Sequence, residues 1–131
     1  MDLSRSDPAY YRLVPYDIVS SAAHARELVR AGLLSEEECG TITAGLDRIR
    51  ADFAAGAIAP SPADEDLHTF IERVLVERLG PLGGKLRAGR SRNDQAANDL
   101  RLYLRWEARA LALRVLDLIE ALADQAGRHL D

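Results

Sequence analysis

The sequence predicts an all-α fold, on three observations. Ala, Leu and Arg recur throughout while aromatic residues make up only 5% of the 131 residues, a composition that suits helices packed on helices better than a sheet. Apolar residues recur at helical spacing in four stretches of the chain. The apolar content of 47% is enough for one modest domain with its own core, but not for several.

The first helix is predicted from about Asp17 to Ala31. Before it, residues 1–16 carry Pro8, Pro15 and three tyrosines without helical spacing, which predicts an irregular segment ordered only where it packs on something. Gly32 is a good terminator for the helix. One apolar stripe along it is formed by Ile18, Ala22, Ala25, Leu28 and Val29.

Two further helices follow. Ser35 and Glu38 stand in the S-x-x-E relation of a capping box, which predicts a second helix running to about Phe53. Residues 54–62 are a loop of small residues, glycine and proline. The acidic triplet at 64–66 then suits the positive end of a third helix, which is predicted to end at Gly80.

A fourth helix is predicted from about Ser91 almost to the C-terminus, after a loop at 80–89 that holds four glycines, one proline and no acid. It would span roughly 55 to 60 Å at 1.5 Å per residue. Large exposed apolar patches normally mark a missing partner, so other subunits or further protein of the same chain should cover this helix. Two apolar stripes follow it, one through Ala97, Leu100, Leu104, Ala108, Leu111, Val115, Leu118 and Leu122, the other through Leu102, Trp106, Leu113, Leu116 and Ile119.

Charge and composition exclude several function classes. Seventeen Lys and Arg against 21 Asp and Glu give a net charge of -4, so no nucleic acid or anionic membrane partner is expected. Cys39 is the single cysteine and no secretory signal opens the chain, which favours a cytoplasmic protein. No run of about 18 uncharged apolar residues predicts a membrane span.

One stretch carries candidate chemistry, the loop before the last helix. Lys85, Arg87, Arg90 and Arg92 lie in a segment, 80–93, that has no acidic residue. Ser91 is a predicted N-cap, so first-turn N–H groups with the helix dipole behind them would face an anion. The residues alone leave two alternatives: a carboxylate site, or a solvated basic loop with an ordinary helix cap.

A family resemblance separates these alternatives. The segment 89–95 reads GRSRNDQ and resembles the first signature of argininosuccinate lyases and the related δ-crystallins. The resemblance covers residues 4–131. It includes the flanking segments 84–86 and 99–102, the acidic stretch 64–68 with Glu72 and Arg73, which is similar to the family's EDxH…ER helix, and residues 16–34, which are similar to its first helix and turn.

The resemblance implies a reaction and a set of binding residues. The family cleaves argininosuccinate to arginine and fumarate, the last step of arginine biosynthesis, by taking a proton beta to the departing nitrogen. The aci-carboxylate formed on the way needs fixed hydrogen-bond donors. Ser91 and Asn93 would bind the carboxylates that end in fumarate, Arg92 would add positive charge, and Ser6 falls at the position of a substrate-contacting serine. The family counterpart of His68 faces the active site.

Structural alternatives stand beside two of these roles. Ser6, in a loose N-terminal segment, could simply be solvated. His68 could be a partly buried structural residue beside Asp64 and Asp66. Glu72 and Arg73 are predicted to be an ion pair on a helix face rather than catalysts.

The chain also departs from the family. Arg87 and Ala88 stand where many members have His-Thr, which removes or replaces a polar contact. The family's GGRF segment, its Thr-His motif and its GSSxMPxKxN loop have no counterpart here, and the last two carry the serine and the histidine of proton abstraction. We therefore expect no catalytic residue, no metal and no cofactor in this chain, and no activity from it alone.

The resulting interpretation is an N-terminal helical domain, residues 1–85, followed by residues 86–131, which hold the signature loop and the first long helix of an incomplete central bundle. The resemblance implies homotetramers with active sites shared between subunits. Adenylosuccinate lyase, fumarase and aspartase are weaker matches because they differ at the SRND positions. A non-catalytic oligomerisation or structural module, as in δ-crystallin, remains the alternative.

Overall fold

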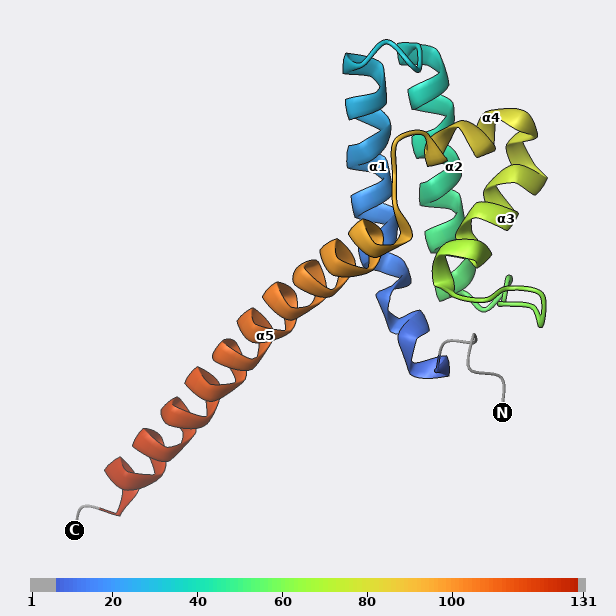
Figure 1. Cartoon of the computed structure of the whole chain (residues 1–131). Helices are drawn as coiled ribbons and strands as arrows, with labels where there is room; N and C mark the ends of the chain where they lie inside the picture. The colour runs from blue at the N-terminus through green and yellow to red at the C-terminus, as the bar shows by residue number, and fades with distance from the viewer. Residues whose placement is uncertain (1–6, 130–131) are drawn as a thin grey trace. The chain divides into compact units, whose positions relative to one another are not determined.

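The structure, a computed structural model, describes residues 7–129, and every regular element among them is helical. The prediction of an all-α fold is confirmed (Figure 1). Contacts group the chain into two compact units that meet between Leu100 and Arg101. The elements are a 3₁₀ helix at Pro8–Leu13, α1 at Val14–Arg30, α2 at Glu36–Ala54, α3 at Leu67–Leu79, α4 at Pro81–Gly84, a 3₁₀ turn at Lys85–Arg87, and α5 at Arg92–Arg128.

The segment before α1 is more regular than predicted. The expectation of an irregular lead-in is wrong for residues 8–13, which form the 3₁₀ helix, and α1 begins at Val14 rather than near Asp17. The Asp7 carboxylate accepts a hydrogen bond of 2.7 Å from the N–H of Ala9 and starts this helix. Leu13 and Val14 are buried, so burial of these side chains anchors a segment that shows little helical periodicity.

The capping box predicted for α2 is present, and one residue of the acidic triplet predicted at the start of α3 caps that helix. The Ser35 hydroxyl accepts from the N–H of Glu38 at 3.1 Å, and the Glu38 carboxylate accepts from the N–H of Ser35 at 2.9 Å. Asp66 caps α3 by accepting from the N–H of Thr69 at 2.7 Å. Gly80 ends α3 with φ of 61°, a left-handed value that glycine adopts at little cost.

The sequence predicts a loop at residues 80–89. The structure instead has α4 and the following 3₁₀ turn in this glycine-rich stretch. Its path is set by close packing on α3. A Cβ added at Gly83 would lie 2.7 Å from the backbone oxygen of Leu75, a distance that no real Cβ tolerates. Glycine therefore serves here to bring two backbones together, and not only to break a helix.

The core of the N-terminal unit, residues 7–100, is formed where α1, α2 and α3 meet. Figure 1 shows α1 and α2 side by side, joined by a short turn, with α3 beside α2. A core of this kind is what fixes the relative positions of the polar side chains described below. The largest completely buried apolar side chains are Ile18, Ile42, Leu46, Ile49, Leu67, Phe70 and Leu75.

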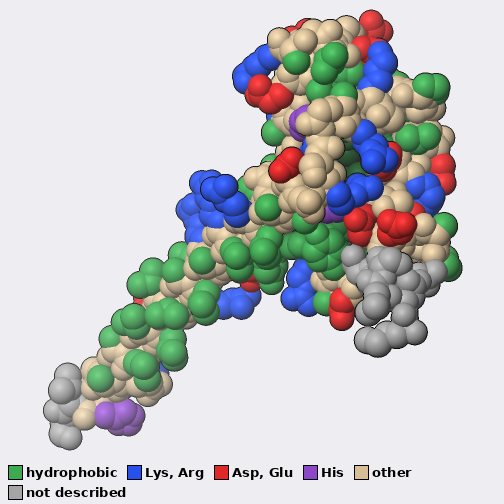
Figure 2. All heavy atoms as spheres, viewed as in Figure 1, with side chains coloured by type: hydrophobic (Ala, Val, Ile, Leu, Met, Phe, Trp, Pro, Cys, Tyr) green, Lys and Arg blue, Asp and Glu red, His purple; other side chains and the backbone are tan. Residues whose placement is uncertain are grey.

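Residues 101–128 form one uninterrupted helix within the second unit. Apart from the half-buried Leu102, the large apolar side chains of both predicted stripes are exposed on this segment, as the green side chains along this helix in Figure 2 show. Trp106 is 66% exposed and Leu111 is 61% exposed. Among the described residues, no helix is long and apolar enough to cross a membrane.

Candidate functional site

A hollow within the N-terminal unit gathers most of the polar groups of interest. It opens between α1, α3, the segment 83–90 and the first turn of α5. The side chains that line it come from segments far apart in the sequence and combine carboxylates, guanidinium groups and a histidine. They belong to Asp17, Ser21, His68, Ile71, Glu72, Leu75, Leu86, Arg87, Arg90, Arg92 and Gln95, with Gly83 completing the wall.

Asp17 and His68, two of these lining residues, belong to a buried polar cluster that also includes Asp99. Asp17 on α1, His68 on α3 and Asp99 on α5 are each at most 2% exposed. The imidazole Nδ1 of His68 lies 3.1 Å from Asp17 Oδ1 and 3.7 Å from Asp99 Oδ2. Three helices thus contribute one side chain each to a single buried contact. Such a contact fixes the first turns of α5 against α1 and α3.

The two carboxyl groups of this cluster titrate in opposite directions. Burial, together with the neighbouring Asp17 carboxylate, raises the pKa of Asp99 to about 8. Burial alone would raise the pKa of Asp17 as well, but hydrogen bonds and charge from His68, and the charge of Arg90, lower it below its usual value. Asp99 therefore holds a proton at neutral pH while Asp17 is ionised.

The same three groups are also spaced closely enough to hold a cation, since their ligand atoms lie within 4.8 Å of one another. The positive charge of Arg90 already acts on both carboxyl groups, which works against binding a second cation here.

Arg90 crosses from the signature segment to α1. Its Nη1 donates to Ser21 Oγ at 2.8 Å and its Nη2 donates to Ser20 Oγ at 2.6 Å. Burial lowers the pKa of this guanidinium, yet it stays charged at any physiological pH because an arginine titrates so far above neutrality. Ser21 in turn donates to Asp17 Oδ2 at 3.1 Å, so the loop is linked to the buried cluster.

Ser91 caps the helix that carries the signature. It directly precedes α5, and its hydroxyl accepts a hydrogen bond of 3.2 Å from the N–H of Asn93. The predicted N-cap is confirmed. Ser91 and Asn93 are both exposed, so their side chains are accessible to a ligand at the positive end of the helix dipole.

Arg92 lies between the start of α5 and the start of α3. Its guanidinium is 3.5 Å from Asp66 Oδ2 and 3.6 Å from Glu72 Oε2, and its Nη2 also lies 3.4 Å from the Thr69 hydroxyl. The side chain is about one third exposed. Arg92 is therefore pre-positioned by carboxylates of α3 rather than free in solvent.

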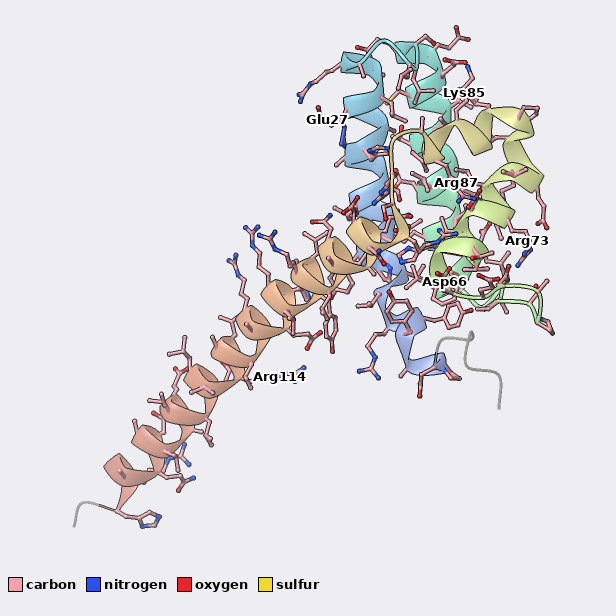
Figure 3. All side chains as sticks on the ribbon, viewed as in Figure 1. Glu27, Asp66, Arg73, Lys85, Arg87 and Arg114 are labelled. Carbon is pink, nitrogen blue, oxygen red and sulfur yellow. The ribbon has the colours of Figure 1, made fainter. Side chains whose placement is uncertain are left out.

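The neighbouring cations are paired as well, through acids that lie far away in the sequence. Lys85 bonds to Glu38 of α2, and Arg87 lies 3.2 Å from Glu72 of α3. The alternative of a solvated basic loop therefore holds only in part, because these side chains are half or more exposed but each is paired with an acid. Residues 80–93 include no acidic residue, but the fold brings Glu38 and Glu72 from other helices next to these cations. Arg87 and Asp66 can be followed in Figure 3.

The predicted Glu72–Arg73 ion pair is also wrong. Arg73 makes a two-pronged contact with Asp64, with both hydrogen bonds at 2.9 Å, and reaches Glu77 at 3.0 Å. Adjacent residues on a helix point about 100° apart and cannot face each other. The labelled Arg73 of Figure 3 lies on α3 in this arrangement.

Of the residues predicted from the sequence, His68 and Arg92 line the hollow, Ser91 and Asn93 lie exposed at the start of α5, and Ser6 lies outside the described residues. His68 is buried against Asp17 and Asp99, not against Asp64 and Asp66 as expected. Its Nε2 has no hydrogen-bond partner among the described residues.

Sequence reasoning missed the residues that hold the signature in place. The sequence indicates no role for Asp17, Asp99 or Ser20 beyond a place in a helix, and places Arg90 only in a basic stretch. One signal was present for Asp17 and Ser20. They are polar residues close beside Ile18, in the part of α1 that the apolar stripe turns toward the core.

Comparison with known proteins agrees with the motif. A family model described as "Lyase" matches residues 3–131. Argininosuccinate lyase 1 of Pseudomonas fluorescens is 64% identical over 129 residues, which are 98% of this chain and 27% of that protein. Argininosuccinate lyase 2 of Rhizobium meliloti is 58% identical, covering 99% of this chain and 27% of that protein. The argininosuccinate lyase of Acidothermus cellulolyticus is also 58% identical, with 98% and 26% covered.

Proposed function

Because this chain belongs to the lyase family, we propose that it forms the N-terminal portion of an argininosuccinate lyase and binds the carboxylates of argininosuccinate at the start of α5. The chain spans about 27% of the length of the curated relatives it matches. The activity, the substrate and the products, arginine and fumarate, are therefore proposals about the complete enzyme.

The single observation that carries this proposal is the geometry of the GRSRNDQ segment. Its Ser91 hydroxyl caps α5, its Asn93 amide lies exposed in the first turn, and Arg92 is held beside them by Asp66 and Glu72. A helix N-terminus flanked by fixed hydrogen-bond donors and a guanidinium is a carboxylate site by its chemistry. The similarity to argininosuccinate lyases makes a four-carbon dicarboxylate the ligand class that we propose for it.

In the proposed reaction, these groups serve the transition state more than the ground state. A base removes the proton beta to the departing nitrogen, and the negative charge that this leaves on the adjacent carboxylate is held by Ser91, Asn93 and Arg92. The C–N bond then breaks as the C=C bond of fumarate forms, and its electron pair leaves on the nitrogen of arginine, which takes up a proton. Donors that are already in place need no reorganisation when that charge develops. The base and the group that assists it are expected on segments that this chain does not match.

His68 has a supporting place in this proposal. Asp17 holds its Nδ1 side at 3.1 Å, and Nε2 is the ring nitrogen without a partner among residues 7–129. Because Nε2 is buried, a substrate polar group would reach it only if the side chains around it move. The hollow that His68 lines also contains Arg92. Ser6 is proposed as a further substrate contact on the resemblance alone.

The proposed assembly follows from the last helix. Two exposed apolar stripes on residues 101–122 suit a helical bundle formed with other copies or with the rest of the enzyme. We propose residues 86–131 as the beginning of that bundle, residues 1–85 as the N-terminal domain, a homotetramer as the oligomer, and the cytoplasm as the compartment. No role for metal or cofactor is proposed.

The test is an assay of fumarate release from argininosuccinate. The chain alone should release none, since proton abstraction needs groups that it does not carry. Mixing it with a polypeptide that supplies the rest of a relative such as the Pseudomonas fluorescens enzyme should restore release, and Asn93→Ala in this chain should abolish the restored activity. Restored activity that is indifferent to Asn93→Ala would refute the proposed binding role. Assembly without any activity would favour the alternative of a structural module.

A further inference from the structure

The start of α5 is fastened to α1 from both sides through one hydroxyl group. Arg90, which directly precedes the capping serine, donates to Ser20 Oγ at 2.6 Å. Asn98, almost two turns into α5, donates from Nδ2 to the same oxygen at 2.8 Å. The proposed carboxylate-binding residues 91–93 lie between these two anchors.

We propose that Ser20 is a positioning residue for the carboxylate site, acting through Arg90 and Asn98. The inference rests on the proposed function for its ligand, a dicarboxylate, although its mechanical part concerns this chain alone. Ser20 does not touch the site. It sets the position at which the helix start presents Ser91, Arg92 and Asn93.

The chemistry of Ser20 suits this role. Its side chain is on the buried face of α1 and only 7% exposed, so water competes poorly for its oxygen. A hydroxyl oxygen has two lone pairs, and here one accepts from a charged guanidinium and the other from an amide. The bond to Arg90 is charge-assisted and therefore short and directional.

Ser21 completes the arrangement but contributes differently. It accepts from the second arm of Arg90 at 2.8 Å and donates to Asp17 at 3.1 Å. The planar fork of Arg90 is thus held on two adjacent hydroxyls, which fixes its orientation as a single bond would not. Of the two serines, Ser20 also bonds to a side chain of α5, that of Asn98. Substituting Ser20 therefore tests the proposed positioning role more directly than substituting Ser21.

The position of the helix start matters for the reaction rate, because displacing a substrate-binding group by about 1 Å can slow catalysis about 100-fold. Two neighbouring features would not replace Ser20. The first is Arg92, which contacts Asp66 and Glu72 and no residue of α1 that the structure describes. The second is the contact of His24 Nε2 with the carbonyl oxygen of Ala88, at 3.0 Å. Ala88 precedes Gly89, which has a φ of 66°, so this contact is separated from the helix start by a glycine turn.

From α1, Ser21 shares Arg90 with Ser20, and Asp17 Oδ1 lies 3.5 Å from Gln95 Nε2 of α5. Of these three residues, Ser20 is the one that bonds on both sides of residues 91–93.

The experiment is hydrogen–deuterium exchange of the 131-residue chain, read by mass spectrometry on peptides that cover residues 90–98, with and without succinate. Ser20→Ala should raise exchange of these peptides about threefold or more without ligand and weaken succinate protection about threefold to tenfold. Ser20→Thr, which keeps the hydroxyl, should restore both. Arg90→Lys, which keeps the charge but cannot span two hydroxyls, should behave as Ser20→Ala does.

The matched control is Thr43→Ala, which removes a hydroxyl that bonds only to carbonyl groups of its own helix α2. It should leave the 90–98 peptides unchanged. If exchange in Ser20→Ala equals that of the unmodified chain, the inference is wrong. If Ser20→Ala loosens the peptides but succinate protects no form of the chain, the positioning role stands and the proposed carboxylate site is what fails.

Discussion

Asp17 Oδ1 lies 3.1 Å from His68 Nδ1, and this buried contact joins residues 51 positions apart in the sequence. It ties α1 to α3 directly beneath the first turns of α5, where Asp99 approaches the same imidazole nitrogen. The polar cluster is therefore part of the foundation of the signature helix. Both the titration of Asp99 and the removal of Asp17 should therefore change the free energy of unfolding.

Asp99→Asn should change how stability depends on pH. The folded chain keeps a proton on Asp99 up to about pH 8, whereas the unfolded chain releases it near the ordinary value of 3.8. The folded state thus binds more protons between these values, and the free energy of unfolding falls as pH rises from about 4 to about 8. Asparagine is neutral throughout, so the variant should be more stable at pH 8, by about 1 kcal/mol or more.

Urea denaturation at pH 5 and pH 8 measures this effect. The gain from Asp99→Asn should be larger at pH 8. An exposed control, Asp94→Asn, lies outside the buried cluster and should leave the pH dependence of stability as it is. If the free energy of unfolding changed between pH 5 and pH 8 by the same amount in Asp99→Asn as in the unmodified chain, Asp99 would be ionised in the folded state.

Asp17→Ala should destabilise the chain, because His68 Nδ1 and the Ser21 hydroxyl would lose a buried partner. Leaving one such group unsatisfied costs on the order of 2 kcal/mol. The pKa of Asp17 is lowered in the fold, so its contribution is present above about pH 4 and disappears as pH falls through the folded pKa. Denaturation at pH 7 and pH 3 should show the difference between variant and unmodified chain shrinking in acid; an equal difference at both values would contradict this account.

Gly83→Ala should be strongly unfavourable while Gly84→Ala should not. A Cβ at Gly83 would meet the Leu75 carbonyl oxygen at 2.7 Å and the N of Val76 at 2.9 Å. These are backbone atoms, so α4 would have to move away from α3 at a cost of about 1 to 3 kcal/mol. A Cβ at Gly84 meets nothing within 4 Å. Thermal unfolding of the two variants side by side decides the matter, and equal midpoints would show that α4 does not pack as described.

The comparison of prediction and structure shows which kinds of signal a sequence carries. Local ones were read correctly: the Ser35–Glu38 capping box, the cap at Ser91 and the glycine stop at Gly80 depend on residues within one turn of each other. The signature segment was recognisable because seven consecutive residues specify it.

Signals that depend on tertiary packing were not readable. Nothing near Lys85 or Arg87 in the sequence names Glu38 or Glu72 as a partner. The convergence of Asp17, His68 and Asp99 requires three helices to be docked first. The 3₁₀ helix at Pro8–Leu13 forms because its last residue is buried, and no periodicity announces it.

The exposed apolar stripes of the last helix predict self-association of the isolated chain. Sedimentation at micromolar concentration should show species larger than the 14.4 kDa monomer. Replacing Leu111 and Leu118, both on one stripe and each close to 60% exposed, by glutamate should shift the chain toward monomer. Arg109→Ala and Arg114→Ala, two exposed positions of the same helix, lower the net charge by the same amount and are the control. A compact monomer for the unmodified chain would contradict the prediction.

The most direct test of the carboxylate site is an NMR titration of the chain with succinate at constant salt. The amides of Arg92, Asn93 and Asp94 should shift, and Arg92→Ala should weaken binding about tenfold or more, since a charge-assisted bond contributes roughly 1.5 to 3 kcal/mol. Lys85→Ala, which removes a cation paired with Glu38, should cost less. If residues 92–94 stay unperturbed while amides elsewhere shift, or if the two variants weaken binding equally, the helix start does not bind carboxylates and the account is wrong.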